Sequence, residues 1–228
     1  MRDFLCIGHR GAKGLEPENT LRSIRKALAL GVDGVEIDVY AVDGQLVVIH
    51  DETLERTTNC AGRVEQQSFD YLRSLDAGSG EKIPVLSEVF DAIDRHAFVN
   101  IELKGKGTAG PVAGLIAEYI GIHGWQNADF LVSSFHLDEL QQLANSGLRL
   151  AMLFTKPPED YARIAASLNA YSIHIAIEHA NETFIKDAHH HGLQVFVYTV
   201  NSPPDIARMQ SIGADGIFTD YPDRMSPL

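Results

Sequence analysis

Short apolar runs alternate with longer amphipathic segments along almost the whole chain, and this alternation limits the fold more than any other feature. Most runs end in polar residues, as buried strands of a parallel sheet do. We predict strands at Phe4–Ile7, Gly34–Val39, Leu46–Ile49, Phe98–Leu103, Phe130–Ser133, Leu148–Phe154, Ser172–Ala176, Gln194–Thr199 and Gly216–Phe218.

The segments between these strands have the spacing of amphipathic helices. Several of them finish at a glycine, such as Gly31 or Gly192, which readily takes the left-handed conformation that ends a helix. Strand–helix alternation of this kind predicts a parallel sheet with helices outside it. We predict helices at Leu21–Leu30, Leu86–Arg95, Val112–His123, Leu137–Ser146, Pro158–Ser167, Glu182–His191 and Pro204–Ile212.

Two architectures satisfy this order, a closed (β/α)8 barrel and an open doubly wound sheet. An open sheet gathers its site at one switch point, whereas a barrel uses the strand ends all around one rim. The wide spread of polar residues at strand ends favours an α/β fold of the (β/α)8 TIM-barrel type. These residues are His9, Asp38, Lys104, Ser134, Thr199 and Asp220.

One stretch interrupts the alternation. Residues 51–84 follow the extra strand Leu46–Ile49 and have mixed polarity, scattered leucines and the segment Gly78-Ser79-Gly80. We predict that they form a small insertion beside the barrel rim. No stretch has the composition of an interdomain linker, so we predict a single domain over residues 1–228.

The composition limits the kinds of partner that the protein can bind. The 228 residues are 45% hydrophobic and carry a formal net charge of -12, so an acidic surface would repel nucleic acid and anionic membranes. Two cysteines are too few for a disulfide framework, and no run approaches the roughly 20 apolar residues of a membrane span. We expect a cytoplasmic protein with a small-molecule substrate, no nucleic-acid partner and no membrane insertion. The sequence leaves the oligomeric state open.

Three carboxylates are placed to share one face of the barrel mouth. Glu36 and Asp38 are two residues apart on one strand, so both point to the same side, and Glu102 lies near the end of another strand. Inward carboxylates without a partner are costly to bury. A ligand set made only of oxygens favours Mg²⁺ or Ca²⁺ over Zn²⁺, with Mn²⁺ as a further candidate.

Two histidines and two cations accompany these acids. His9 and His50 each follow an apolar run, and imidazoles transfer protons near neutral pH. Arg10 and Lys104 are suited to hold phosphoryl oxygens and to offset charge that develops on them. We predict that the histidines are catalytic and that the cations bind phosphate. The complete set is what the hydrolysis of a phosphate diester would need.

The same residues lie in motifs that resemble the glycerophosphodiester phosphodiesterase family of the cytoplasmic bacterial type. The resemblance runs nearly from end to end, and the order of the motifs makes it specific. The motifs are His9-Arg10-Gly11, Pro17-Glu18-Asn19-Thr20, Gly34 to Val39, Asp43-Gly44, His50-Asp51 with Leu54 and Arg56 to Thr58, Leu75 to Gly78, Ile83 to Leu86, Ile101 to Lys104, Ser133 to Phe135, Thr199 to Asn201, and Gly213 to Pro222.

The resemblance implies a (β/α)8 barrel with a small insertion after its second strand, a metal held at Glu36, Asp38 and Glu102, and acid–base roles for His9 and His50. It implies hydrolysis of glycerophosphodiesters to glycerol 3-phosphate and an alcohol. Two residues depart from the family pattern, Tyr198 in place of Trp and Val85 in place of Thr. Two rival functions are a lipid-directed phosphodiesterase on the same barrel and a catalytically silent phosphate or metal sensor.

Overall fold

The computed structural model describes residues 4–225 and shows a closed barrel of parallel strands. The strand order is β1-β2-β4-β5-β6-β7-β8-β9, and β9 pairs back with β1. The predicted (β/α)8 TIM barrel is confirmed. Residues 1–3 and 226–228 of the predicted domain lie outside the described residues. The strands are β1 (Leu5–Gly8), β2 (Gly34–Val42), β4 (Phe98–Leu103), β5 (Phe130–Ser134), β6 (Arg149–Phe154), β7 (Ser172–Ala176), β8 (Gln194–Tyr198) and β9 (Gly216–Thr219).

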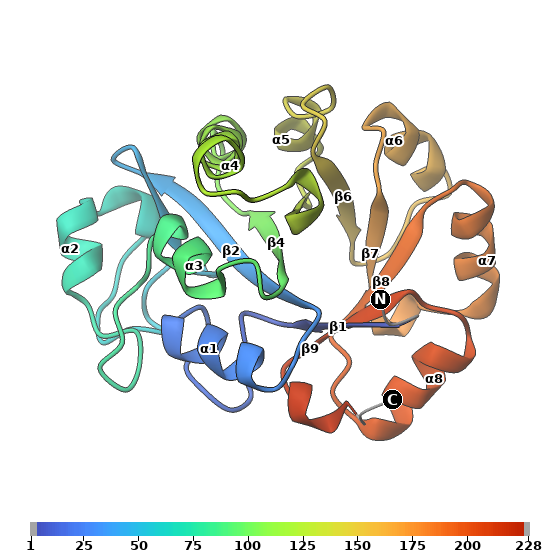
Figure 1. The fold of residues 1–228 in the computed structure, drawn as a ribbon, viewed down its shortest axis with the longest axis horizontal. Coiled ribbons are helices and arrows are strands. Elements are labelled where there is room, and N and C mark those ends of the chain that lie inside the picture. Colours follow the sequence, from blue (N-terminus) through green and yellow to red (C-terminus); the bar gives the residue numbers. More distant parts are fainter. Residues whose placement is uncertain (1–3, 226–228) are drawn as a thin grey trace.

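Helices connect successive strands and cover the outside of the barrel (Figure 1). They are α1 (Leu21–Ala29), α3 (Leu86–Ile93), α4 (Ala109–Ile122), α5 (Leu137–Gln141), α6 (Tyr161–Ser167), α7 (Glu182–His190) and α8 (Pro203–Ser211). Several begin at a residue whose side chain accepts a backbone hydrogen bond, as Thr20 does for α1 and Ser202 for α8. Between residues 4 and 225, no helix combines the length and the apolarity needed to cross a bilayer.

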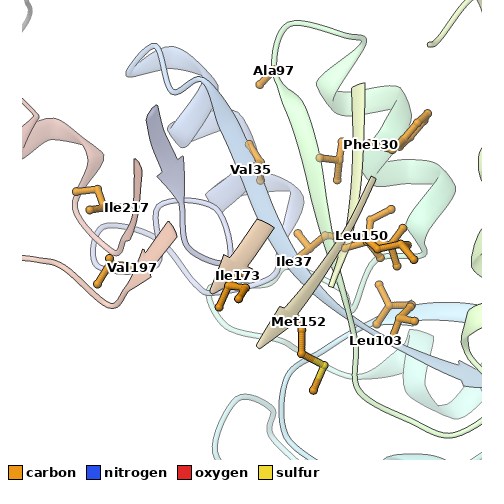
Figure 2. Close-up of a cluster of buried hydrophobic side chains, with 14 of the residues drawn as sticks. Val35, Ile37, Ala97, Leu103, Phe130, Leu150, Met152, Ile173, Val197 and Ile217 are labelled. Atoms are coloured by element: carbon orange, nitrogen blue, oxygen red, sulfur yellow. The ribbon is translucent and has the colours of Figure 1, made fainter. Parts of the chain in front are cut away.

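The main core lies between the strands and the surrounding helices (Figure 2). Val35 and Ile37 of β2 are fully buried in it, and each such side chain stabilises the fold by roughly 1.5–3 kcal/mol. Because side chains alternate along a strand, burying these two residues outside turns Glu36 and Asp38 toward the barrel interior. The apolar pattern of β2 therefore positions two of the predicted metal ligands.

The interior of the barrel is packed below its rim. A second set of apolar side chains fills it, made up of Ile7, Leu131, Ala151, Phe196 and Phe218. All of these are nearly or fully buried. The barrel is therefore closed beneath the site.

The segment after β2 forms a lobe beside the barrel, at the left of Figure 1. Strand β3 (Gln45–Val48) pairs antiparallel with β2, and a short helix, α2 (Phe69–Ser74), follows. The lobe has an apolar cluster of its own that includes Val47, Leu54, Leu72 and Ile83. These residues lie beside the barrel. The bounds of the insertion, about 51–84, stay a prediction.

Some boundaries differ from those predicted. Strand β2 continues to Val42 rather than Val39 because it forms a hairpin with β3. Helix α4 begins at Ala109 rather than Val112. Its first turn is held from another element, since the Glu139 carboxylate accepts hydrogen bonds from the backbone amides of Gly107 and Ala109. Sequence spacing alone does not reveal such a cap.

Candidate active site

Three acidic side chains converge at the carboxyl-terminal rim of the barrel. Glu36 and Asp38 come from β2 and Glu102 from its neighbour β4, where Asp38 and Glu102 are paired in register. One oxygen from each lies within 4.8 Å of the others, and all three residues are buried. Burial, with the nearby charges of Asp38 and Glu102, raises the pKa of Glu36 well above its ordinary value. Burial and Asp38 raise the pKa of Glu102 to about 7.

Whether a divalent cation fits this site depends on how much of the negative charge of the three carboxylates the protein itself compensates. The Arg10 backbone amide donates to Glu36 Oε2 at 2.8 Å, and the guanidinium of Arg10 also lowers the pKa of Glu36, yet that pKa remains raised. The protein's own cations therefore compensate the three carboxylates only in part. Closely spaced oxygen donors that need further positive charge suit a hard divalent cation, so the donor set fits one.

The two predicted phosphate-binding cations flank the acidic cluster. Lys104 Nζ lies 2.8 Å from Glu102 Oε1 and 3.8 Å from Asp38 Oδ1. Arg10 Nε lies 3.3 Å from Asp38 Oδ2. Burial opposes the charged form of both cations, but the carboxylates around them raise the pKa of each. Both side chains therefore remain charged beside the acids.

Each predicted catalytic histidine is held by a carboxylate. His9 Nδ1 lies 2.6 Å from Asp220 Oδ1, and His50 Nδ1 lies 2.6 Å from Asp51 Oδ1. Burial would raise the pKa of Asp220, but the hydrogen bond from His9 lowers it to about 2, so Asp220 is charged and accepts. Burial lowers the pKa of both imidazoles, which leaves each Nε2 as an acceptor near neutral pH.

An ion-pair network that the sequence did not reveal joins the two histidine loops. Arg56 donates to both oxygens of Glu18, at 2.7 and 2.8 Å, and to both oxygens of Asp51, at 2.6 and 2.8 Å. Arg10 Nη1 donates to Glu18 Oε1 at 2.7 Å. Burial would raise the pKa of Glu18, but hydrogen bonds from Arg56 and the charge of Arg10 lower it to about 2. The network positions Asp51, which in turn orients His50.

Asn19 contacts the acidic cluster from the loop before α1. It directly precedes Thr20, whose side chain caps α1. Asn19 lies in the left-handed region with φ of 56°, and its Nδ2 donates to Asp38 Oδ2 at 2.9 Å. Asn19 therefore orients one of the acidic ligands, a contact that a local sequence pattern does not show.

A cavity of about 280 Å³ opens at this rim. Its lining includes five of the seven predicted site residues: His9, Arg10, Glu36, His50 and Glu102. Asp38 and Lys104 are not part of this lining but contact it through Arg10 and Glu102, respectively. Its lining also includes the apolar side chains Leu153 and Phe218, and Tyr198, whose hydroxyl donates to the Phe154 carbonyl at 3.0 Å. The cavity is thus lined by both charged and apolar side chains.

The closed barrel with this site at its carboxyl-terminal rim is the arrangement of a (β/α)8-barrel enzyme. The sequence model of the glycerophosphoryl diester phosphodiesterase family matches residues 9–224, and the chain belongs to that family. The predicted family and the predicted class of enzyme are confirmed.

Similar proteins cover the chain almost completely. A glycerophosphodiester phosphodiesterase of Bacillus altitudinis is 37% identical over 96% of this chain and 95% of its own length. One of Caldanaerobacter subterraneus is 34% identical over 98% and 97%. A solved structure of an Oleispira antarctica phosphodiesterase in complex with the product sn-glycerol-3-phosphate is 29% identical, covers 96% of this chain and 94% of that one, and superposes with a TM-score of 0.87.

Proposed function

We propose that the protein hydrolyses glycerophosphodiesters to glycerol 3-phosphate and an alcohol, with a divalent cation at Glu36, Asp38 and Glu102. The observation that carries the proposal is the convergence of these three carboxylates beside one cavity, which Glu36 and Glu102 line together with both histidines. When bound, the cation supplies positive charge opposite the phosphoryl oxygens. Mg²⁺ and Ca²⁺ are the favoured ions because all three donors are oxygens, and Mn²⁺ is a further candidate.

Phosphate binding and proton transfer are assigned to different side chains. Arg10 and Lys104 bind phosphoryl oxygens and stabilise the charge that grows on them in the transition state. One imidazole accepts the proton of the attacking hydroxyl as the new P–O bond forms. The other donates a proton to the leaving alkoxide as the old P–O bond breaks. Since Asp220 and Asp51 hold each Nδ1, the Nε2 atoms of His9 and His50 carry these protons.

The attacking hydroxyl has two sources. Water attacks phosphorus directly, or the glycerol 2-hydroxyl attacks first and forms a cyclic phosphate that water then opens. Hydrolysis in oxygen-18 water, with a search for the cyclic product, separates these routes. A cyclic intermediate that accumulates and is then consumed supports the second route.

The proposal is tested by measuring glycerol 3-phosphate released from glycerophosphocholine. We expect the protein to lose activity with a chelator and to recover it in a panel of Mg²⁺, Mn²⁺ and Ca²⁺. His9→Ala and His50→Ala should each lower kcat by on the order of a hundredfold or more, the usual contribution of a general acid or base. Activity that withstands both the chelator and the substitutions would contradict the mechanism.

Two rival functions make different predictions. A lipid-directed phosphodiesterase would prefer lysophospholipids and bind liposomes in high salt, whereas a silent sensor would bind phosphate or metal without turnover. The acidic net charge of -12 disfavours lipid docking. A cytoplasmic location and the lack of a nucleic-acid partner stay predictions from the sequence.

A further inference from the structure

Two buried polar side chains deep in the cavity each keep an atom without a hydrogen-bond partner among residues 4–225. Asn100 Nδ2 donates to Ser133 Oγ at 3.1 Å, but Oδ1 is unpartnered. His174 Nε2 lies 3.2 Å from Ser172 Oγ, but Nδ1 is unpartnered. Both residues line the cavity, and neither is more than 1% exposed. They differ from every residue assigned above to the metal, the phosphate or proton transfer.

These two residues lie on strands of the barrel wall, before the carboxyl-terminal rim. Asn100 is level with Glu36, with which it pairs in register, and it precedes Glu102 by two residues on β4, which places it about 7 Å deeper than Glu102 along the strand at ~3.3 Å per residue. His174 lies on β7, and its ring packs against Phe218 and Phe196 with centroids 4.8 and 5.4 Å away. The inner end of the cavity, its floor, therefore carries two polar atoms without a hydrogen-bond partner among the described residues.

The hydrogen-bonding capacity of these two atoms indicates which chemical group binds them. The apolar surroundings lower the pKa of His174 to about 3, so the ring is neutral and offers one donor and one acceptor nitrogen. An amide likewise offers both kinds of atom. A hydroxyl donates and accepts at once, so it satisfies either arrangement. A carboxylate or phosphate oxygen only accepts, and a quaternary ammonium group does neither.

We propose that Asn100 and His174 form a floor subsite that binds the terminal hydroxyl of the substrate's glycerol unit. This deepens the proposed phosphodiesterase function and rests on it. The phosphate lies at the rim with Arg10 and Lys104, and a three-carbon chain spans the depth from there to the floor. The leaving alcohol then points toward the open mouth of the cavity. The floor subsite selects a hydroxylated three-carbon unit over a deoxygenated one.

The test compares two ligands by calorimetry with the cation-loaded protein. One is sn-glycerol 3-phosphate, and the other is propane-1,2-diol 1-phosphate, which keeps the 2-hydroxyl but lacks the terminal one. We expect the unmodified protein to bind the glycerol compound about tenfold more tightly or better, a difference of ~1.4 kcal/mol. Asn100→Leu and His174→Phe should remove most of that preference by weakening only the glycerol compound. His174→Gln, which keeps a polar group, should restore part of it.

Leu153→Ala is the matched control, because Leu153 lines the same cavity and has no polar atom in its side chain. It should change both affinities by the same factor. Equal affinities in the unmodified protein, binding of neither ligand, or a preference that survives both substitutions would overturn the floor subsite. Hydrolysis of glycerophosphocholine is measured in parallel. A binding preference without hydrolysis refutes the proposed function but keeps the subsite, and hydrolysis without a preference refutes the subsite alone.

Discussion

Asp220 holds His9 at 2.6 Å although 211 positions separate them in the chain. Asn201 fixes this carboxylate in turn, since its Nδ2 donates to Asp220 Oδ2 at 2.9 Å and its Oδ1 accepts from the Asp220 amide at 2.8 Å. Asp51 has the same relation to His50. Each imidazole is thus oriented through Nδ1 by an aspartate, and the Nε2 atom of His50 lies 3.3 Å from Lys104 Nζ.

Replacing Asp220 with Asn should therefore impair His9 in two ways. Burial lowers the pKa of His9, and the hydrogen bond with Asp220 acts against that effect. Without the carboxylate the pKa falls further, so the limb of the kcat/KM profile that reports His9, acidic if His9 is the base and basic if it is the acid, should move to lower pH. Loss of orientation should also lower kcat by roughly tenfold to a hundredfold. The pH dependence of kcat/KM for glycerophosphocholine measures both effects.

Asp215→Asn is the control for this prediction. Asp215 also pairs with an imidazole, His189, at 2.7 Å, but it lies next to the amino-terminal end of β9, opposite the rim. The Asp215→Asn variant should leave that limb in place. If both variants moved the limb equally, the effect would come from general charge loss rather than from the contact with His9.

Arg56→Ala should lower activity although Arg56 lies in the lobe and none of its contacts is to the acidic cluster. The guanidinium joins Glu18 to Asp51, and its removal frees Asp51 to turn away from His50. We expect a fall in kcat of about tenfold with a smaller change in KM. Arg56→Lys should recover little, because one ammonium group cannot bind two carboxylates in the paired geometry of a guanidinium.

Arg63→Ala is the matched control in the same lobe. Arg63 is half exposed and pairs only with the exposed Glu52 among the described residues, at 2.8 Å. Exposed pairs of this kind contribute roughly 0–1 kcal/mol, so activity should stay unchanged. Equal losses in the two variants would show that the lobe as a whole, rather than the network, supports the site.

The convergence of Glu36, Asp38 and Glu102 could be predicted from the sequence because strand alternation fixes the direction of a side chain. Once Val35 and Ile37 are buried outside the barrel, Glu36 and Asp38 must point inward. The roles of the residues that orient the site could not be predicted in this way. Asp220 and Arg56 act across long stretches of chain, so their roles depend on tertiary contacts that no local pattern encodes.

Other residues carried a weaker sequence signal. Asn100 and His174 are polar positions inside apolar strand runs, and such positions indicate a buried polar contact without naming its partner. Asn19 lies just before α1, where Asn is common as a helix cap, yet its side chain contacts Asp38 instead. The cap of α4 comes from Glu139 on the next helix, and only the packed structure reveals it.

Glu36→Gln should stabilise the cation-free protein and abolish its response to cations. In the folded state the pKa of Glu36 is raised above its ordinary 4.5, so its charge destabilises the fold above that pH. One pKa unit corresponds to ~1.4 kcal/mol, and each kcal/mol shifts Tm by roughly 2–4 °C at this size. The gain should shrink as the pH falls toward 4.5. Thermal unfolding with a chelator, and again with saturating Mg²⁺ or Ca²⁺, measures these changes.

Glu182→Gln serves as the control, because Glu182 pairs with Lys186 on an exposed helix face. It should leave the cation response intact. A Glu36→Gln protein that still gains the full increment in Tm from the cation would place the ion elsewhere.

Val85→Thr should stabilise the protein without changing its activity. Val85 precedes α3, and its amide donates to Glu88 Oε2 at 3.0 Å, which is half of a capping box. Valine lacks a side-chain acceptor, so the amide of Glu88 receives no cap from it. Threonine has nearly the same shape and supplies that acceptor, which is worth about 1 kcal/mol at a helix start. Chemical denaturation measures the gain, and Val85→Ala, which loses packing and adds no cap, should be less stable than the unmodified protein. A Val85→Thr protein no more stable than the original would show that the hydroxyl does not reach the helix.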